Sequence, residues 1–114
     1  RSKGLVINIS SISAKGNIGQ SAYSVAKSGI EVLTKIWAQE LKSFNIRIAC
    51  ISPGFFDTKS TRVALSNSQI EYIKNNTPVR RLGKVKELIL ALEFIIKNEF
   101  YNGKVLALDG GLEI

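Results

Sequence analysis

Two short apolar runs, GLVINIS at residues 4–10 and IRIACI at residues 46–51, bracket a segment with helical spacing from about Ser21 to Ser43. Both runs are rich in β-branched residues and almost continuously apolar, which is typical of strands buried in a parallel sheet. A strand, a long helix and a second strand make a βαβ unit. We therefore expect two parallel strands joined by a right-handed crossover.

The rest of the chain continues this alternation. A loop rich in Gly, Ser and Asn is expected up to Gly19, and a Ser-Pro-Gly segment ends the second strand. The sequence then predicts a weak helix over residues 66–75 with Ser66 or Asn67 as its N-cap, a strong helix over residues 84–98, and a last buried strand over residues 104–108. This order of elements predicts an α/β fold with an open, mostly parallel sheet.

The long helix carries apolar residues on two sides. A helix with two apolar sides is buried against more than one partner. We expect one side to cover the sheet and the other to contact a neighbouring helix or a second copy of the chain. One stripe consists of Ala22, Ala26, Ile30, Leu33, Trp37 and Leu41, and the other of Val25, Gly29, Val32 and Ile36.

The composition limits the class of protein. The 114 residues suffice for one small domain, and the apolar content of 45% is ordinary for a globular protein. No apolar run approaches the roughly 20 residues of a membrane span. The single Cys50 has no partner for an internal disulfide, and the absence of His argues against a His-based triad and most zinc sites. We expect a cytoplasmic protein with no metal site and no membrane partner.

The net charge of +7 raises the alternative of a nucleic-acid-binding protein. The positive residues are scattered, however, and the densest group, Arg80-Arg81 with Lys84 and Lys86, is not interleaved with aromatic residues. A solvated basic surface is the favoured interpretation, so no nucleic-acid partner is expected. Salt-sensitive binding to DNA would support the alternative.

A proton-transfer pattern lies between the two apolar runs. Tyr23 and Lys27 are four residues apart on the expected helix, so their side chains meet on one face. An ammonium about 4–5 Å from a phenol stabilises the phenolate by a few kcal/mol at an effective dielectric constant near 20. Ser10 and Ser11 follow the first strand, at the sheet edge where open α/β folds bind ligands. Such a set can pass a proton to a carbonyl oxygen.

The chain resembles the C-terminal half of a short-chain dehydrogenase/reductase of the classical type, similar to β-ketoacyl-carrier-protein reductases and related dehydrogenases. The resemblance implies the C-terminal half of a doubly wound parallel-sheet Rossmann-like fold, with residues 1–114 forming part of a single domain. The matching pieces occur in family order and cover nearly the whole chain. They are Asn8-Ile9-Ser10-Ser11, Tyr23-Ser24-Val25-Ala26-Lys27, Ser52-Pro53-Gly54-Phe55-Phe56-Asp57-Thr58, Pro78-Val79-Arg80-Arg81-Leu82-Gly83, Tyr101-Asn102-Gly103 and Asp109-Gly110-Gly111.

The resemblance implies an oxidoreductase that uses NAD or NADP to interconvert a carbonyl and a hydroxyl group of a small molecule. Tyr23 would be the general acid/base. Lys27 would stabilise its phenolate and bind the nicotinamide ribose, to which Tyr23 also lies close. Ser11 would orient the substrate. The Asn-Ile-Ser-Ser motif favours Ser11, whereas counting back from Tyr23 over the commoner loop length favours Ser10, so both serines stay open.

Further roles are implied on the cofactor side. Pro53, Gly54 and Phe55 would line the nicotinamide, Thr58 would hold its carboxamide or phosphate side, and residues 59–79 would cover the substrate. The Gly-rich phosphate turn, the residue that selects the ribose and a catalytic Asn belong upstream of Arg1 in the family. The choice between NAD and NADP therefore stays open, and we expect the isolated chain to be inactive.

Two further expectations complete the sequence interpretation. Family members commonly pair through the helix at about residues 21–43, which implies a homo-oligomer, either a dimer or a tetramer. The alternative to an enzyme is a truncated or degenerate chain that acts as a non-catalytic structural or interaction module.

Overall fold

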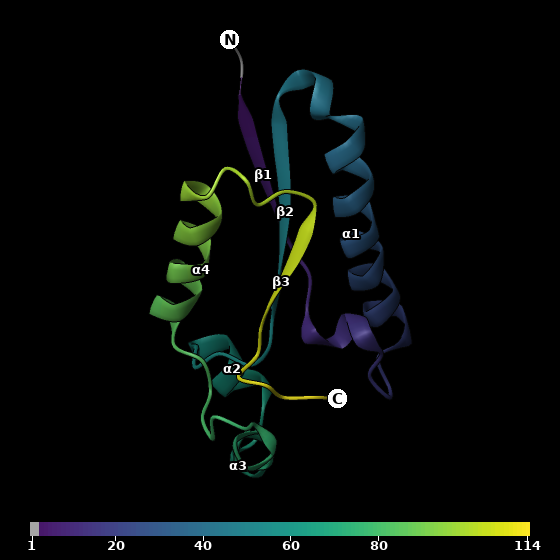
Figure 1. Cartoon of the computed structure of the whole chain (residues 1–114). Coiled ribbons are helices and arrows are strands. Elements are labelled where there is room, and N and C mark those ends of the chain that lie inside the picture. Colours follow the sequence, from purple (N-terminus) through teal and green to yellow (C-terminus); the bar gives the residue numbers. More distant parts are fainter. Residues whose placement is uncertain (1–2) are drawn as a thin grey trace.

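The computed structural model describes residues 3–114 and arranges them as a three-stranded parallel sheet with helices on both faces (Figure 1). Helix α1 covers one face and α4 the other, while α2 and α3 lie beyond the carboxyl ends of the strands. In chain order the elements are β1 (Gly4–Ile9), the 3₁₀ helix η1 (Ile12–Lys15), α1 (Ser21–Glu40), the 3₁₀ helix η2 (Lys42–Phe44), β2 (Ile46–Pro53), α2 (Lys59–Ala64), α3 (Asn67–Asn76), α4 (Val85–Lys97) and β3 (Lys104–Leu108).

The strand order is β1-β2-β3, and both pairings are parallel. Gly4 lies opposite Ile46, and Ala49 lies opposite Lys104. The expected βαβ unit is confirmed, because α1 connects the parallel neighbours β1 and β2. The α/β fold class predicted from the sequence is confirmed with it.

The core is built around β2, the only described strand that pairs on both sides. Its residues from Ile48 to Ile51 are fully buried. On the α4 side, Ala49 and Ile51 pack with Ala91 and Ile95, and Leu and Ile residues from the flanking strands surround them. Full burial of one such aliphatic side chain contributes about 1.5–3 kcal/mol. This face therefore holds α4 to the sheet.

The flanking strands differ from the expectation of burial on both faces. Among the described residues, β1 and β3 are the edges of the sheet, and Val6, Ile9, Lys104 and Ala107 are exposed. The physical reason is that each of these strands pairs on one side only. The helices on the two faces of the sheet therefore cover the central strand more completely than they cover β1 and β3. An apolar run therefore predicted the strands correctly but overestimated their burial.

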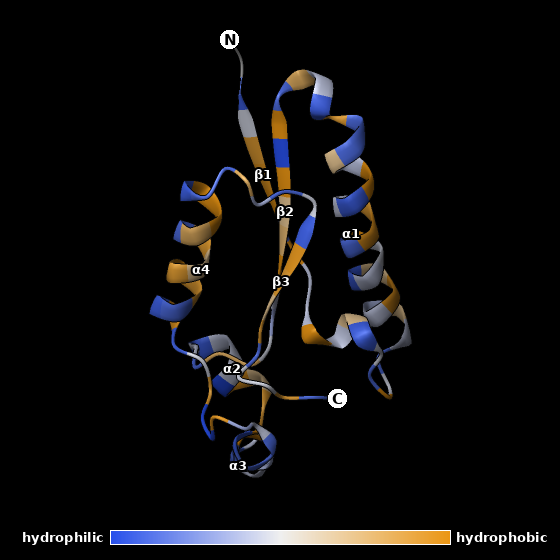
Figure 2. Cartoon of the chain, in the orientation of Figure 1, coloured by the Kyte–Doolittle hydropathy of each residue, from blue (hydrophilic) through white to orange (hydrophobic). Residues whose placement is uncertain are grey.

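The expectation that an apolar stripe of α1 covers the sheet is met only in part, because Ile30, Trp37 and Leu41 of the first stripe are half-buried whereas Ala22, Ala26 and Leu33 are exposed. The buried residues of α1 are Ser24, Thr34 and Ala38, which belong to neither stripe. Val25 and Val32, by contrast, are 72% and 52% exposed. Figure 2 shows apolar residues along the side of α1 that faces away from the sheet. Ala38 is small and Thr34 is hydrogen-bonded to Asn8 of β1, so the helix lies close to the strands there, and a hydropathy pattern does not detect such a contact.

The helix boundaries differ from expectation in the connecting segments. A 3₁₀ helix occupies part of the expected loop before Gly19, and α1 ends at Glu40, after which η2 leads to Asn45 in the left-handed region at φ 58°. The second strand continues to Pro53, and the short helix α2 was not predicted.

The later helices agree well with the sequence. Ser66 is confirmed as the N-cap of α3, where it forms a reciprocal capping box with Gln69. Helix α4 and strand β3 lie where they were expected, within a residue at each end. Across residues 3–114, no helix is both long enough and apolar enough to cross a bilayer.

Candidate active site

The carboxyl ends of all three strands lie at the same end of the sheet, close to η1, α2 and α3 (Figure 1). Ser10 and Ser11 follow β1, the segment from Gly54 to Thr58 follows β2, and Asp109 follows β3. Parallel strands place their carboxyl ends together, so residues that are far apart in the sequence meet here.

Ser10 is held inside the protein. Its side chain is 3% exposed, and its hydroxyl donates a hydrogen bond of 2.7 Å to Oε2 of Glu31. The same hydroxyl lies 3.4 Å from the carbonyl oxygen of Ile51, which also accepts the Ser10 backbone N–H at 2.8 Å. The hydroxyl hydrogen of Ser10 is therefore committed to protein acceptors.

Ser11 is in a different environment. It is half-buried, and its Oγ accepts a hydrogen bond of 3.1 Å from the backbone N–H of Ser13, which caps η1. In residues 3–114 the hydroxyl hydrogen of Ser11 is donated to no recorded acceptor. This hydroxyl can donate to a bound molecule while it keeps its structural contact.

Tyr23 and Lys27 come together on the first turns of α1. Nζ of Lys27 lies 5.6 Å from the centre of the Tyr23 ring, within the range of a cation–π contact. The same ammonium donates a hydrogen bond of 3.2 Å to the carbonyl oxygen of Ile9, at the end of β1. Tyr23 is 46% exposed, so its hydroxyl is open to a ligand. The pair thus lies beside the strand end that carries the two serines.

The loop from Ser11 to Tyr23 is held by its own polar contacts. The hydroxyl of buried Ser13 donates to Oε1 of Gln20 at 2.9 Å, and Nδ2 of Asn17 donates to the same oxygen at 2.9 Å. These bonds close the loop between the serine and the tyrosine and restrict its conformations.

The residues expected on the cofactor side have structural contacts as well. A Cβ on Gly54 would come within 2.9 Å of Cα of Asp109, so only glycine allows the exits of β2 and β3 to approach this closely. Phe55 accepts the Gly83 N–H at its carbonyl oxygen, at 2.9 Å. Thr58 caps α2 by accepting the Thr61 N–H at 3.2 Å. Pro53 ends β2.

A concave surface adjoins this end of the sheet, between the Ser11–Tyr23 loop and α3. A pocket of about 360 Å³ is lined by Ile18, Tyr72 and Ile73, together with the C-terminal residues Leu112 and Ile114. A second pocket of about 290 Å³ shares Phe55, Tyr72 and Ile73 with it. Both linings are mainly apolar, as is usual for sites that bind small organic molecules.

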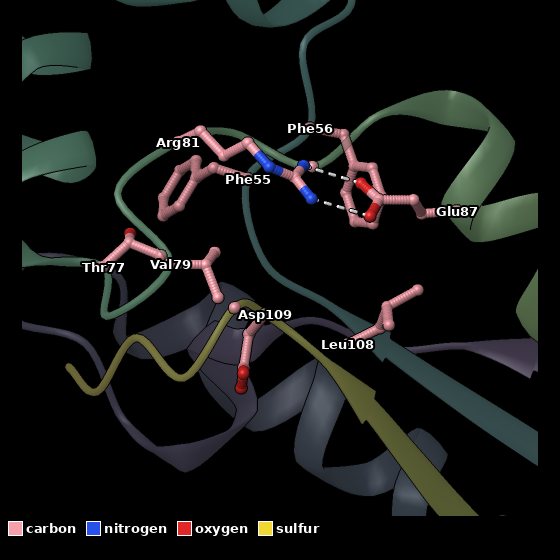
Figure 3. A pocket seen from close by; sticks show the side chains of 10 residues that line it. Phe55, Phe56, Thr77, Val79, Arg81, Glu87, Leu108 and Asp109 are labelled. Atoms are coloured by element: carbon pink, nitrogen blue, oxygen red, sulfur yellow. Dashed lines mark hydrogen bonds and ion pairs between the residues drawn. The ribbon is translucent and has the colours of Figure 1, made fainter.

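A separate pocket of about 130 Å³ lies beyond the ends of β2 and β3 (Figure 3). Phe55, Phe56, Val79 and Leu108 supply its apolar lining. Ser11, Tyr23 and Lys27 are not among the described residues that line it. Of the residues expected to hold the cofactor, Phe55 lines it.

An ion pair forms one wall of this pocket. Arg81 donates from both terminal nitrogens to the carboxylate of Glu87, each at 2.8 Å, as Figure 3 shows. This bidentate contact, helped by the Lys84 backbone N–H, lowers the pKa of Glu87 from 4.5 to about 2. The same contact raises the pKa of Arg81.

The ion pair predicts a pH dependence of stability. Because the folded carboxyl has the lower pKa, its stabilising effect is complete above pH 4.5 and is lost as the pH falls towards 2. We expect Glu87→Gln to unfold more easily than wild type at neutral pH, and the difference to shrink through this window. Thermal unfolding of both proteins at several pH values measures it. Parallel curves, with a difference that does not depend on pH, would contradict the prediction.

A family model described as enoyl-(acyl carrier protein) reductase matches residues 1–113 of the chain. The chain belongs to this short-chain dehydrogenase/reductase family. The resemblance inferred from the motifs is therefore confirmed. Among curated members of the family, the 3-oxoacyl-[acyl-carrier-protein] reductase of Chlamydia muridarum is 39% identical over an alignment of 112 residues that covers 96% of this chain and 45% of that protein. The mouse 3-oxoacyl-[acyl-carrier-protein] reductase is 37% identical, over 97% of this chain and 46% of that protein.

Solved structures of dehydrogenases share the fold. A 3-hydroxyacyl-CoA dehydrogenase type-2 from Mycobacterium avium superimposes with a TM-score of 0.90 at 34% identity, covering 97% of this chain and 43% of that one. A 7α-hydroxysteroid dehydrogenase in complex with NADH and 7-oxo glycochenodeoxycholic acid has a TM-score of 0.90 at 26% identity, covering 96% of this chain and 45% of that one. The chain thus spans less than half the length of the family members it matches.

Three residues near the site were not singled out from the sequence, namely Ser13, Gln20 and Glu31. Their contacts join positions that are 7 or 21 residues apart. No local pattern predicts such pairs. Had the sheet-facing side of α1 been known, the charged Glu31 on that side would have indicated a polar contact with the strand end.

Proposed function

We propose that this chain carries the proton-transfer half of the active site of an NAD(P)-dependent oxidoreductase that interconverts a carbonyl and a hydroxyl group. The observation that carries the proposal is the contact of Lys27 with the Tyr23 ring, beside the end of β1, in a member of a family with dehydrogenase structures. The neighbouring steroid dehydrogenase, solved with NADH and a 7-oxo compound, supports this reaction type.

Tyr23 acts as the general acid in the direction of reduction. A nicotinamide held by Lys27 and the residues after β2 would supply the hydride for the carbonyl carbon. The Tyr23 hydroxyl donates its proton to the carbonyl oxygen, so the product is an alcohol and the tyrosine is left as phenolate. The nearby Lys27 ammonium stabilises that phenolate. General acid catalysis of this kind contributes about 10²–10⁴-fold in rate.

Ser11 is the serine that orients the substrate in this proposal. Its hydroxyl hydrogen is free to donate to the substrate oxygen, whereas that of Ser10 is donated to Glu31. A fixed donor aimed at the developing negative charge lowers the barrier because it needs no reorganisation during the reaction.

The residues at the carboxyl ends of the strands have donors and backbone suited to a nicotinamide nucleotide. Lys27 uses one N–H on the Ile9 carbonyl and keeps its remaining donors for ribose hydroxyls. Pro53, Gly54 and Phe55 bring the backbone at the end of β2 to the same end of the sheet, where the nicotinamide would lie against them, and Thr58 adds a hydroxyl beyond them. Tyr23 completes this group. Residues 1–114 alone are proposed to be inactive, because a family member of full length has more than twice as many residues with which to bind the nucleotide.

The apolar surface beside α3 is the proposed location of the substrate body. Residues 59–79, which include α2 and α3, cover this surface, and Phe55 and Tyr72 contribute to both of its pockets. The substrate proposed is a small-molecule carbonyl or alcohol, as the names of the related reductases and dehydrogenases suggest.

An activity assay on the complete protein tests this proposal. The protein would be given NADH or NADPH with a 3-oxoacyl thioester and, separately, a 7-oxo steroid, and cofactor oxidation would be followed by absorbance. Turnover of either ketone supports an oxidoreductase. Tight nucleotide binding without turnover of any ketone or alcohol would contradict it.

A second function, as an association module, is favoured by the exposed apolar side of α1, where Val25, Val32, Leu33 and Ile36 all face solvent. We propose that a second copy of the chain covers this side, which would make the protein a homo-oligomer whether or not it is catalytic. Contiguous apolar surface of this kind is characteristic of protein–protein contacts.

The association proposal predicts that Val32→Lys shifts the complete protein towards the monomer, because the change buries a charge in the contact. Sedimentation or light scattering measures the shift. Asn75→Lys, which adds the same charge at an exposed position of α3, is the control. An unchanged association state in Val32→Lys would exclude this side of α1 as the contact.

A further inference from the structure

We propose that Glu31 is a positioning residue that sets the place of Ser11 relative to Tyr23 and Lys27. It acts through the side chain of Ser10. This inference rests on the proposed oxidoreductase function.

The contact joins the two elements that carry the candidate catalytic groups. Glu31 lies on α1, one helical turn beyond Lys27 and two turns beyond Tyr23. Its Oε2 accepts the hydroxyl of Ser10 at 2.7 Å, and Ser10 is covalently bonded to Ser11. The distance between the Ser11 and Tyr23 hydroxyls therefore depends on how α1 lies on the end of β1, where this bond is made.

Three hydrogen bonds join α1 to β1 and to Ser10, which follows it. Nδ2 of Asn8 donates to Oγ1 of Thr34 at 3.1 Å, and Lys27 donates to the Ile9 carbonyl at 3.2 Å. The Ser10–Glu31 bond is the shortest of these three contacts, and its acceptor is a carboxylate oxygen. Hydrogen bonds to charged acceptors are roughly twice as strong as neutral ones.

The Ser10–Glu31 bond also adjoins the candidate catalytic groups, because Ser10 precedes Ser11 and Glu31 lies one turn beyond Lys27. Val25, Val32 and Ile36 face away from the sheet, so the apolar packing of α1 is limited to its other side, where Ile30 and Trp37 are half-buried. Lys27 divides its donors between the Ile9 carbonyl and, in the proposed function, ribose hydroxyls, whereas the Glu31 contact serves only to join the strand end and the helix. A displacement of about 1 Å between reacting groups can lower the rate about 10²-fold.

Kinetics of four variants of the complete protein test the proposal. They are Glu31→Ala, Glu31→Gln, Ser10→Ala and the double variant Ser10→Ala/Glu31→Ala. We expect Glu31→Ala to lower kcat by about ten- to a hundredfold, with less change in KM for the nucleotide. Glu31→Gln keeps a carbonyl oxygen as acceptor, so it should restore kcat to within about threefold of wild type.

The double variant separates positioning from general damage. If Glu31 acts through Ser10, Glu31→Ala should lower kcat little further once Ser10 has been replaced, because the shared bond is already lost. Glu40→Ala removes the same charge at an exposed position of the same helix and should behave as wild type. Thermal unfolding of each variant checks that the folded fraction is equal.

Three results would overturn the inference while leaving the proposed function intact. They are an unchanged kcat in Glu31→Ala, equal losses in Glu31→Gln and Glu31→Ala, and fully additive losses in the double variant. A wild-type protein that binds the nucleotide but turns over no ketone or alcohol would overturn both the function and this inference.

Discussion

Tyr23→Phe is expected to lower kcat for ketone reduction by about 10²–10⁴-fold in the complete protein. The change removes only the hydroxyl that would donate the proton. The ring remains, so Lys27 keeps its aromatic contact at 5.6 Å and its hydrogen bond to the Ile9 carbonyl. Because Tyr23 is 46% exposed, the loss of its hydroxyl leaves no buried polar group unpaired. Steady-state kinetics with saturating nucleotide measure the effect.

Tyr101→Phe is the matched control for this change. Tyr101 lies between α4 and β3, with its ring edge-on to Phe94 at 5.3 Å, away from the carboxyl ends of the strands. It also loses only a hydroxyl, and kcat should stay near the wild-type value. If Tyr23→Phe retained wild-type activity, another group would have to supply the proton, and the proposed role of Tyr23 would be wrong.

Ile95→Ala is expected to destabilise the fold by about 2–5 kcal/mol. Ile95 is 0% exposed and lies at the centre of the contact between α4 and β2, where it packs with Ala49, Ile51 and Ala91. The substitution removes buried methyl and methylene groups and leaves a cavity that the strands are too rigid to fill. Small domains are stable by only about 5–15 kcal/mol, so this loss is a large share of the total. Chemical denaturation of the complete protein gives the free energy of unfolding.

The adjacent residue provides the control. Ile96 is on the same helix but is 55% exposed, so Ile96→Ala should cost far less than Ile95→Ala. Equal losses for the two variants would mean that α4 does not pack on the sheet through the side that carries Ile95.

The elements of the fold follow from local patterns in the sequence. The apolar runs before Ser10 and before Pro53 became β1 and β2, and Ser66, one of the two expected candidates, became the N-cap of α3. Strand and helix signals of this kind depend on neighbours within about one helical turn, so they can be recognised without the fold. The short helix α2 was missed because its residues carry no apolar periodicity.

The burial of the elements was harder to predict. Polar Thr34 is buried against the sheet, whereas Val25 and Val32, which were expected to contact a neighbouring helix or a second copy of the chain, meet no helix of this chain and are exposed. A hydropathy pattern ranks the sides of a helix by apolar content. The side that docks is instead the one whose small and hydrogen-bonded side chains match the strand beneath it.

The candidate site divides in the same way. The sequence was enough to identify the residue types of the site. Tyr23 and Lys27 are one helical turn apart and two serines follow a strand, and both i, i+4 spacing and strand ends are local features. The different environments of Ser10 and Ser11 depended on the folded chain. They arise because the packing of α1 on the sheet places Glu31, 21 residues after Ser10, at the end of β1. There Glu31 accepts the hydroxyl hydrogen of Ser10. A bond between residues so far apart depends on how the helix lies against the strand, and this arrangement forms only when the whole βαβ unit packs.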